Sequence, residues 1–302
     1  MTLSEFKELF QAVSNWGRWG EDDERGALNH LNADRVVAAA ALIRTGRTIT
    51  LSLPLNTHAG IANPEPADHH MTTMVDAQAD GLQFVKDYIG IDYHNDSHTH
   101  LDAFCHVAFD GVLYNGVPSD SITSEGGAAG TVAAAKDGLI GRGVLLDVPR
   151  LRAVPWLEPG ENIFRDDLEL AEHEQGVTVG DGDILLVRTG HPRRLAEVGA
   201  WDTANAKAGL HPSTATFLAD RAVAVLGSDG NSDTAPSATE GVGFPMHVLA
   251  LTAMGVPLLD YLQLDELSAG CASSGRWEFF FAAAPLRIVG GTGSPLNPIA
   301  VL

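Results

Sequence analysis

"DILLVRT" at residues 183–189 is one of three similar segments that determine the fold class of this 302-residue chain. The others are "GVLLDV" at 143–148 and "AVAVLGSD" at 222–229. All three are nearly continuous apolar runs, whereas a strand with one face in water would alternate apolar and polar residues. We therefore predict three strands that are buried on both faces of a sheet.

Helix-forming segments separate and flank these predicted strands. The segment at 34–45 is rich in helix formers, and Asn32 is placed to cap its first turn. Further helices are predicted at 165–175, 192–198 and 244–255. Alternating strands and helices indicate an α/β fold. Because the chain shows no repeat, low-complexity tract or linker, we predict a single compact domain over residues 1–302.

Three segments nearer the chain ends complete the predicted elements. Residues 48–55 have the β-branched content of another strand. Residues 277–290 indicate two further strands, interrupted at Pro285. In contrast, "GGTGSPLNP" at 290–298 is so rich in glycine and proline that we predict neither a helix nor a strand there.

The chain is strongly acidic. It has 19 lysines and arginines against 39 aspartates and glutamates, so its formal charge is 19 − 39 = −20. Such a charge repels nucleic-acid phosphates and anionic lipid surfaces, so neither nucleic acid nor membrane is an expected partner.

The N-terminus lacks the pattern of a secretory signal, and no segment approaches the ~20 apolar residues that cross a bilayer. With only two cysteines, which cannot form a disulfide framework, these features predict a cytoplasmic protein.

The segment "HNDSHTHLDAFCH" at 94–106 holds four histidines and two aspartates. Apolar neighbours such as Leu101 and Phe104 indicate that the segment belongs to the core. Burying several chargeable groups without partners would cost several kcal/mol each, and a divalent cation would satisfy them directly. A solvated strand face with incidental histidines is the alternative. On an extended strand, one face would carry the five even-numbered residues His94, Asp96, His98, His100 and Asp102.

Strand geometry limits which of these groups can share an ion. On a straight strand His94 and Asp102 would lie roughly 26 Å apart, whereas His100 and Asp102 would lie only about 6.6 Å apart. Either the chain bends after Asp96, or only part of the set binds metal. His106 follows Asp102 by four residues, so a turn can bring it back to the site as a base. Cys105 would then point to the opposite face, as a buried structural residue.

The segment "THLDAFCH" at 99–106 resembles the T-H-x-D-x-P-x-H signature of the cyclase-like metal hydrolases, the family that includes bacterial kynurenine formamidase and isatin hydrolase. Phe104 stands where the family has proline. The likeness continues in "NWGRWGEDDERGALNHL" at 15–31, "LGSDGNSD" at 226–233 and "APLRIVGGTGSPLNPIAV" at 284–301. The chain is most similar to the longer members of the family. The resemblance implies a mostly β core of the swivelling β/β/α type, flanked by helices.

The resemblance also implies a set of metal ligands. It makes His100 and Asp102 ligands, and similarity to the longer members selects His94 as the third. In the short members the corresponding ligand position falls on Asp96 of this chain, while straight-strand geometry favours His98. The choice of His94 therefore requires a bend in the chain.

Catalytic roles follow from the same resemblance. His106 corresponds to the catalytic histidine, and His247 to a histidine that completes a second metal site. The acid that would complete this second site with His247 is Asp260. Three roles stay open for His247: a ligand of the second metal, a proton donor in the pocket, or a core residue whose ring is fully hydrogen-bonded. His70 is a further residue that the resemblance directs towards the substrate.

We expect one Mn²⁺ or Zn²⁺ ion, with a second ion as an open alternative, because mixed nitrogen and oxygen ligands suit either metal. The implied activity is hydrolysis of a small cyclic amide or formamide, a small-molecule substrate, with His106 removing a proton from water. A lactone hydrolase or a cyclase is the alternative among enzymes, and a metal-binding protein without turnover is the alternative outside them. Chain size and the resemblance predict a homodimer or homotetramer.

Overall fold

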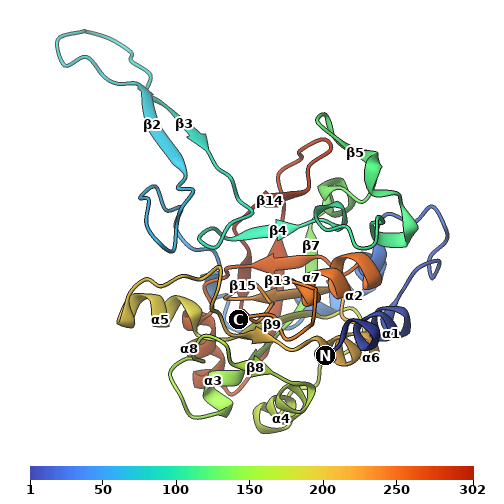
Figure 1. Cartoon of the computed structure of the whole chain (residues 1–302). Coiled ribbons are helices and arrows are strands. Elements are labelled where there is room, and N and C mark those ends of the chain that lie inside the picture. The colour runs from blue at the N-terminus through green and yellow to red at the C-terminus, as the bar shows by residue number, and fades with distance from the viewer.

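A nine-stranded mixed sheet forms the centre of the fold in the computed structural model, which describes residues 1–302 (Figure 1). The strand order is β1-β15-β13-β7-β9-β11-β12-β4-β14. The strands of this sheet are β1 (Thr48–Thr50), β4 (His100–Asp102), β7 (Leu139–Asp147), β9 (Ile184–Arg188), β11 (Val225–Ser228), β12 (Leu258–Asp260), β13 (Glu278–Ala283), β14 (Gly293–Pro295) and β15 (Ile299–Val301). Three two-stranded sheets pair β2 (Asp68–Thr73) with β3 (Lys86–Gly90), β5 (Ile122–Thr123) with β6 (Gly126–Gly127), and β8 (Asn162–Ile163) with β10 (Gly209–Leu210).

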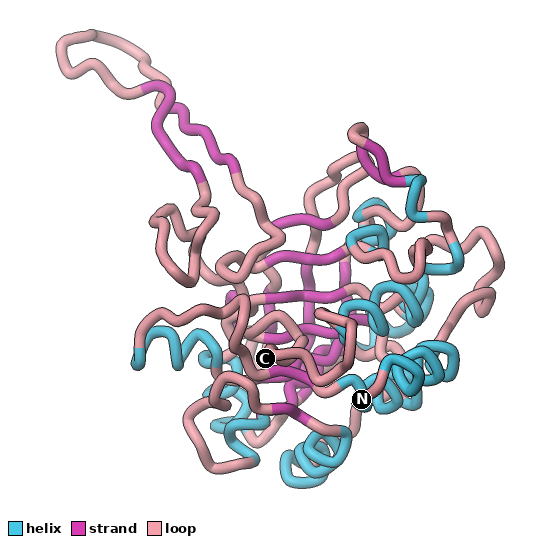
Figure 2. Tube along the Cα trace, viewed as in Figure 1, coloured by secondary structure: helices cyan, strands magenta, loops and turns pink.

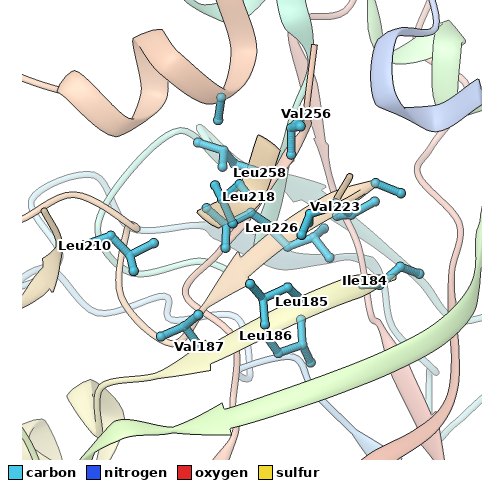
Figure 3. Close-up of a cluster of buried hydrophobic side chains, with 14 of the residues drawn as sticks. Ile184, Leu185, Leu186, Val187, Leu210, Leu218, Val223, Leu226, Val256 and Leu258 are labelled. Atoms are coloured by element: carbon cyan, nitrogen blue, oxygen red, sulfur yellow. The ribbon is translucent and has the colours of Figure 1, made fainter. Parts of the chain in front are cut away.

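The three strands predicted from continuous apolar runs are confirmed as β7, β9 and β11. Together with β12 they form the parallel centre of the sheet. Every residue of β9 and β11 is buried, because helices and loops cover both faces of the sheet. Figure 3 shows side chains of these strands, including Leu185, Leu186 and Leu226, packed with Leu218 and Val256 from neighbouring segments.

Helices surround the central strands (Figure 2). The predicted α/β class and the single compact domain are therefore confirmed. None of the helices is both long and apolar enough to cross a membrane. The α-helices are α1 (Leu3–Val13), α2 (Ala33–Ala40), α3 (Val148–Leu151), α4 (Arg165–Gln175), α5 (His191–Val198), α6 (Ala215–Asp220), α7 (Pro245–His247) and α8 (Asp265–Ser274). The tighter 3₁₀ turns are η1 (Gly26–His30), η2 (Phe104–His106), η3 (Tyr114–Gly116), η4 (Ser119–Ser121), η5 (Val132–Ala135) and η6 (Pro212–Thr214), and η7 (Val248–Met254) is a π-helix.

The predicted helices are present: α4 has the predicted ends, α5 begins one residue earlier, and the other two differ more. Helix α2 stops at Ala40 rather than residue 45, and Asn32 caps it by accepting a hydrogen bond from the Arg35 amide at 3.1 Å. The helix predicted at 244–255 begins as α7 and continues as the π-helix η7. It ends at Gly255, whose left-handed backbone, with φ of 61°, suits glycine.

Three strand predictions need correction. The strand expected at 48–55 ends at Thr50, and residues 284–292 form a loop after β13 instead of a second strand. Conversely, β14 lies inside the segment predicted to form no regular element. Glycine is required there, because a Cβ on Gly293 would lie 2.2 Å from the Leu101 carbonyl oxygen of β4. Proline is tolerated because β14 is an edge strand.

A glycine in the sheet generates the first prediction. Gly143 of β7 pairs with Phe279 of β13, and a Cβ at Gly143 would lie 2.3 Å from the Phe279 ring. Gly143→Ala should therefore lower the free energy of unfolding by about 1–3 kcal/mol through overpacking, measured as a lower urea midpoint. Gly141→Ala on the same strand is the matched control, because its Cβ meets only the ends of two flexible side chains, Leu31 at 3.3 Å and Ile184 at 3.7 Å. Equal midpoints for both variants would contradict this packing argument.

Candidate metal centre

Strand β4 places the central residues of the site. It lies between β12 and β14, antiparallel to both, and all three of its residues are buried. Because side chains alternate along a strand, His100 and Asp102 share one face while Leu101 packs into the core on the other. The predicted pairing of His100 with Asp102 on one face is confirmed.

The chain bends sharply before β4. Residues 94–98 form turns and bends, so of the two alternatives that the sequence left open the chain takes the bend. The bend carries the His94 ring back to Asp102, where His94 Nδ1 lies 2.8 Å from Asp102 Oδ1. The other ring nitrogen contacts the Thr292 hydroxyl at 2.9 Å. The bend that the choice of His94 requires is therefore present.

Hydrogen bonds fix the orientation of two further histidines. His100 Nδ1 donates to the His98 carbonyl at 2.7 Å, which turns its Nε2 towards Asp102 Oδ1 at 3.4 Å. His247 Nδ1 bonds Asp233 at 2.6 Å, so its Nε2 faces Asp102 Oδ2 at 3.3 Å and Asp260 Oδ2 at 3.4 Å. Each ring thus presents one nitrogen to the same small space. Such outer partners typically orient metal-binding histidines.

Asp102 is the common neighbour of these rings. It is 1% exposed, and the only groups close to its carboxylate oxygens are nitrogen atoms of His94, His100 and His247, at 2.8, 3.4 and 3.3 Å, none of which makes a hydrogen bond of good geometry. Burial would raise the pKa of Asp102, but the surrounding histidines, His100 above all, outweigh it and hold the pKa well below its usual range. A buried anionic carboxylate surrounded by histidine nitrogens is costly unless protons on those rings or a bound cation balance its charge. The donor set therefore fits a metal ion.

The charges on the histidines depend on the same carboxylates. Burial opposes the charged form of His100 and His247, but Asp102 and other buried carboxylates overcome it and raise both pKa values. For His247 the increase is large, because Asp102, Asp233 and Asp260 all face the ring. A divalent cation would supply the positive charge that protons on these rings otherwise supply.

His106 lies at the end of the 3₁₀ turn η2, which returns the chain towards β4 after Asp102. Its ring stacks on His94 with 3.8 Å between ring centroids. Burial lowers the pKa of His106 to about 4, and the neighbouring histidines add to this effect. The ring is therefore neutral at physiological pH and able to accept a proton.

Two overlapping groups have ligand atoms close enough to share an ion. One contains His94, Asp102 and His106, and the other contains His100, Asp102 and Asp260, with all ligand atoms of a group within 4.8 Å of one another. The predicted ligands are thus gathered around Asp102 but divided between two groups. His106 therefore lies close enough to His94 and Asp102 to share a metal ion with them, although the sequence predicts that it is a base.

The alternative ligands lie elsewhere. The ring of His98 hydrogen-bonds Asn95 and the Asn56 carbonyl, away from Asp102. Asp96 lines the cavity, but it pairs with Lys207 at 3.2 Å and accepts a short hydrogen bond from the Tyr261 hydroxyl. His70 is exposed on β2, where it bonds Asp68, and it does not line this cavity.

A cavity of about 390 Å³ opens beside the histidines. Apolar side chains form much of its wall, and Asn231 supplies an amide. The apolar residues are Val107, Ala108, Phe109, Val242, Phe244 and Val248. Cys105 is buried and does not line this cavity, as predicted, and burial raises the pKa of its thiol to about 11.

Sequence reasoning missed two supporting residues. Asp233 accepts a hydrogen bond from the Met246 amide at the start of α7, and it also bonds the His247 ring and so orients it. It ends the segment "LGSDGNSD", which carried a resemblance but no assigned role. Lys207 is 1% exposed beside Asp96, and an isolated lysine gives no signal in the sequence.

Comparison with known proteins places the chain in the Cyclase family, whose sequence profile matches residues 49–233. The solved structure of a novel cyclase is 34% identical, with 97% of this chain and 99% of that chain covered and a TM-score of 0.88. An isatin hydrolase bound to the product analogue thioisatinate is 20% identical over 90% of this chain and 99% of that one, with a TM-score of 0.63. A predicted metal-dependent hydrolase from Bacillus stearothermophilus is 17% identical over 84% and 97%, with a TM-score of 0.51. None of the curated proteins matches the sequence. The chain belongs to the Cyclase family.

The position of Asp102 generates the second prediction. Asp102→Ala should remove the carboxylate common to both groups of ligand atoms, so bound metal should fall to background in elemental analysis of the purified protein. Asp96→Asn is the matched control, because Asp96 is a partly buried carboxylate of the same cavity that pairs with Lys207. It should keep its metal. Full metal occupancy in the Asp102 variant would overturn the site.

Proposed function

We propose that the protein is a metal-dependent hydrolase that opens small cyclic amides, formamides or related carbonyl compounds. The observation that carries the proposal is the buried Asp102 carboxylate, on which nitrogen atoms of three histidines converge at 2.8–3.4 Å. Hydrolases share its fold, namely an isatin hydrolase and a predicted metal-dependent hydrolase. A cytoplasmic location, and the lack of nucleic-acid and membrane partners, stay predictions from the sequence.

We assign His94, His100 and Asp102 as the ligands of one divalent cation, with Mn²⁺ and Zn²⁺ both suited to this donor set. His94 and His100 belong to different groups around Asp102, so binding one ion would draw their rings closer together. When bound, such an ion polarises a carbonyl oxygen and lowers the pKa of a coordinated water from 15.7 to about 7. Asp260 and His247 lie beside the same carboxylate, which supports a second ion there. The Asp233 carboxylate holds the His247 ring in the orientation that it needs, whether it binds a second ion or donates a proton in the cavity.

His106 is the proposed general base. It is neutral, because burial lowers its pKa to about 4, and its ring borders the cavity beside Asp102. Stacking against His94 fixes the plane of the ring, so its nitrogen can accept a proton from a water held at the site. The same ring can return the proton to the leaving nitrogen when the carbon–nitrogen bond breaks.

The size and the lining of the cavity suit a small and partly flat substrate. A volume of about 390 Å³ is at the small end of ligand pockets. Phe109 and Phe244 offer aromatic faces, while the Asn231 amide can hydrogen-bond a substrate carbonyl. Because the apolar wall excludes water from one side of the reacting carbonyl, the hydrolytic water must come from the histidine side.

Ester chemistry is the neighbouring alternative, since a lactone offers the same carbonyl to the same groups. Product analysis with a cyclic amide and its matched lactone distinguishes the two, and the proposal expects faster opening of the amide. A metal-binding protein without turnover would need neither His106 nor a cavity beside the ligands. If the protein only binds metal, none of the compounds tested should be hydrolysed.

The third prediction separates a base from a ligand. His106→Asn should retain its metal, because His94, His100 and Asp102 remain, but turnover of the best amide substrate should fall by about 10²–10⁴-fold. Elemental analysis and single-substrate kinetics on the same preparation provide both measurements. His98→Asn is a control for loss of an imidazole outside the cavity, and it should keep more of the activity. Loss of metal from the His106 variant would show that His106 is a ligand.

The fourth prediction concerns removal of the metal. A ligand that binds only the folded state stabilises it by about 2.7 kcal/mol when present at 100 times its dissociation constant. Chelation should therefore lower the melting temperature of the wild-type protein, and addition of Mn²⁺ or Zn²⁺ should restore it. The melting temperature of Asp102→Ala should not respond to chelation. A wild-type melting temperature that ignores chelator would contradict metal binding at this site.

A further inference from the structure

The long β2–β3 hairpin, residues 68–90, projects from the body of the molecule as an arm (Figures 1 and 2). All residues of β2 are exposed, and all of β3 except Gly90. An isolated two-stranded hairpin is at best marginally stable in water. The arm therefore needs a further surface to be well ordered.

Apolar side chains concentrate at the arm tip, which we define as residues 74–85. Leu82 is 84% exposed and Phe84 is 67% exposed, and three other large apolar side chains, Met74, Val75 and Val85, are also exposed. Burying one such side chain fully is worth about 1.5–3 kcal/mol. A cluster of this kind on a projecting element is typical of a protein contact surface.

The tip has a defined shape. The Gln83 side chain crosses it, accepting a hydrogen bond from the Asp76 amide at 2.6 Å and donating to the carbonyls of Asp76 at 3.0 Å and Ala79 at 3.1 Å. The bonds of this one amide close the loop into a compact knob. A preformed knob loses less conformational freedom on docking than an open loop would.

A matching surface lies between η5 and the segment that joins β13 to β14. We call it the basic groove, a hollow of about 250 Å³ lined by Val132, Ala133, Lys136, Leu286, Arg287, Ile288 and Val289. Val289 is 96% exposed, and Leu286 is exposed as well. Neither Lys136 nor Arg287 forms an ion pair within the chain, although most arginines of the protein do.

We propose that the arm tip of one copy docks in the basic groove of a second copy. The arm carries four aspartates and one lysine, so its formal charge is 1 − 4 = −3, opposite in sign to the groove. Because the whole chain has a charge of −20, two copies repel each other unless cations lie at their contact. The basic groove supplies unpaired cations next to exposed apolar side chains, which is the complement of the tip.

The placement of the two surfaces suits a symmetric pair. The arm and the β13–β14 segment project from the same end of the molecule but diverge from each other (Figure 1). The arm tip therefore does not cover the groove of its own chain. A two-fold axis through that end would give each arm a groove, so one contact is made twice. This arrangement specifies the interface of the homodimer that the sequence predicts.

A charge exchange tests the docking. Gln78→Lys with Asp80→Lys reverses the tip, and Lys136→Glu with Arg287→Glu reverses the groove. Each variant alone places like charges together, so its dimer dissociation constant should rise at least about tenfold in analytical ultracentrifugation. An equal mixture of the two should recover a dimer of unequal chains, resolved by native mass spectrometry, because both contacts in that dimer pair opposite charges.

Two further variants complete the test. Leu82→Ser with Phe84→Ser should also weaken the dimer, because it removes apolar area without changing charge. Glu8→Lys with Asp22→Asn changes the net charge by the same +3 as the tip variant but lies outside the arm, and its dimer should resemble the wild type. Circular dichroism confirms that each variant folds. A monomeric wild type at micromolar concentration, charge variants that dimerise normally, or a mixture without the unequal dimer would each overturn the proposal.

Discussion

The site depends on one constraint, a buried carboxylate whose only close neighbours are histidine nitrogens. Asp102 is fixed at the end of a strand with both neighbours paired, so it cannot turn its oxygens to water. Its charge persists because His100 and the other histidines hold its pKa low. The surrounding structure must therefore supply positive charge at this point, from protons on histidine or from a bound cation.

The fold meets this constraint by bringing several separate segments to β4. The bend at residues 94–98 returns His94, the turn η2 returns His106, and the start of the helix at 245–254 delivers His247. Asp260 arrives on β12, the strand next to β4, directly opposite His100. None of these segments is stable as a site alone, because each presents chargeable groups that only the others can balance.

Residues without chemical roles hold this arrangement in place. Gly293 lets β14 approach β4 closely enough for the Thr292 hydroxyl to reach the His94 ring. Asp233 fixes both the start of α7 and the orientation of the His247 ring, whose Nε2 then faces Asp102. Lys207 and Tyr261 engage Asp96, which keeps a third cavity carboxylate paired and away from Asp102. The proposed chemistry therefore relies on residues distributed over most of the chain.

The sequence by itself determined the elements whose signal is local. The apolar runs in β7, β9 and β11 predict buried strands because side-chain burial on both faces requires continuous apolar residues, and His100 and Asp102 share a face because strand side chains alternate. Tertiary structure alone decided whether His94, Asp96 or His98 reaches Asp102, since the answer depends on a bend held by distant Thr292, Asn56 and Lys207. It also made a strand of Gly293–Pro295, where glycine and proline argue against one locally. The physical reason is the same in both cases: backbone pairing and charge balance are satisfied by partners far away in the sequence, which no local pattern records.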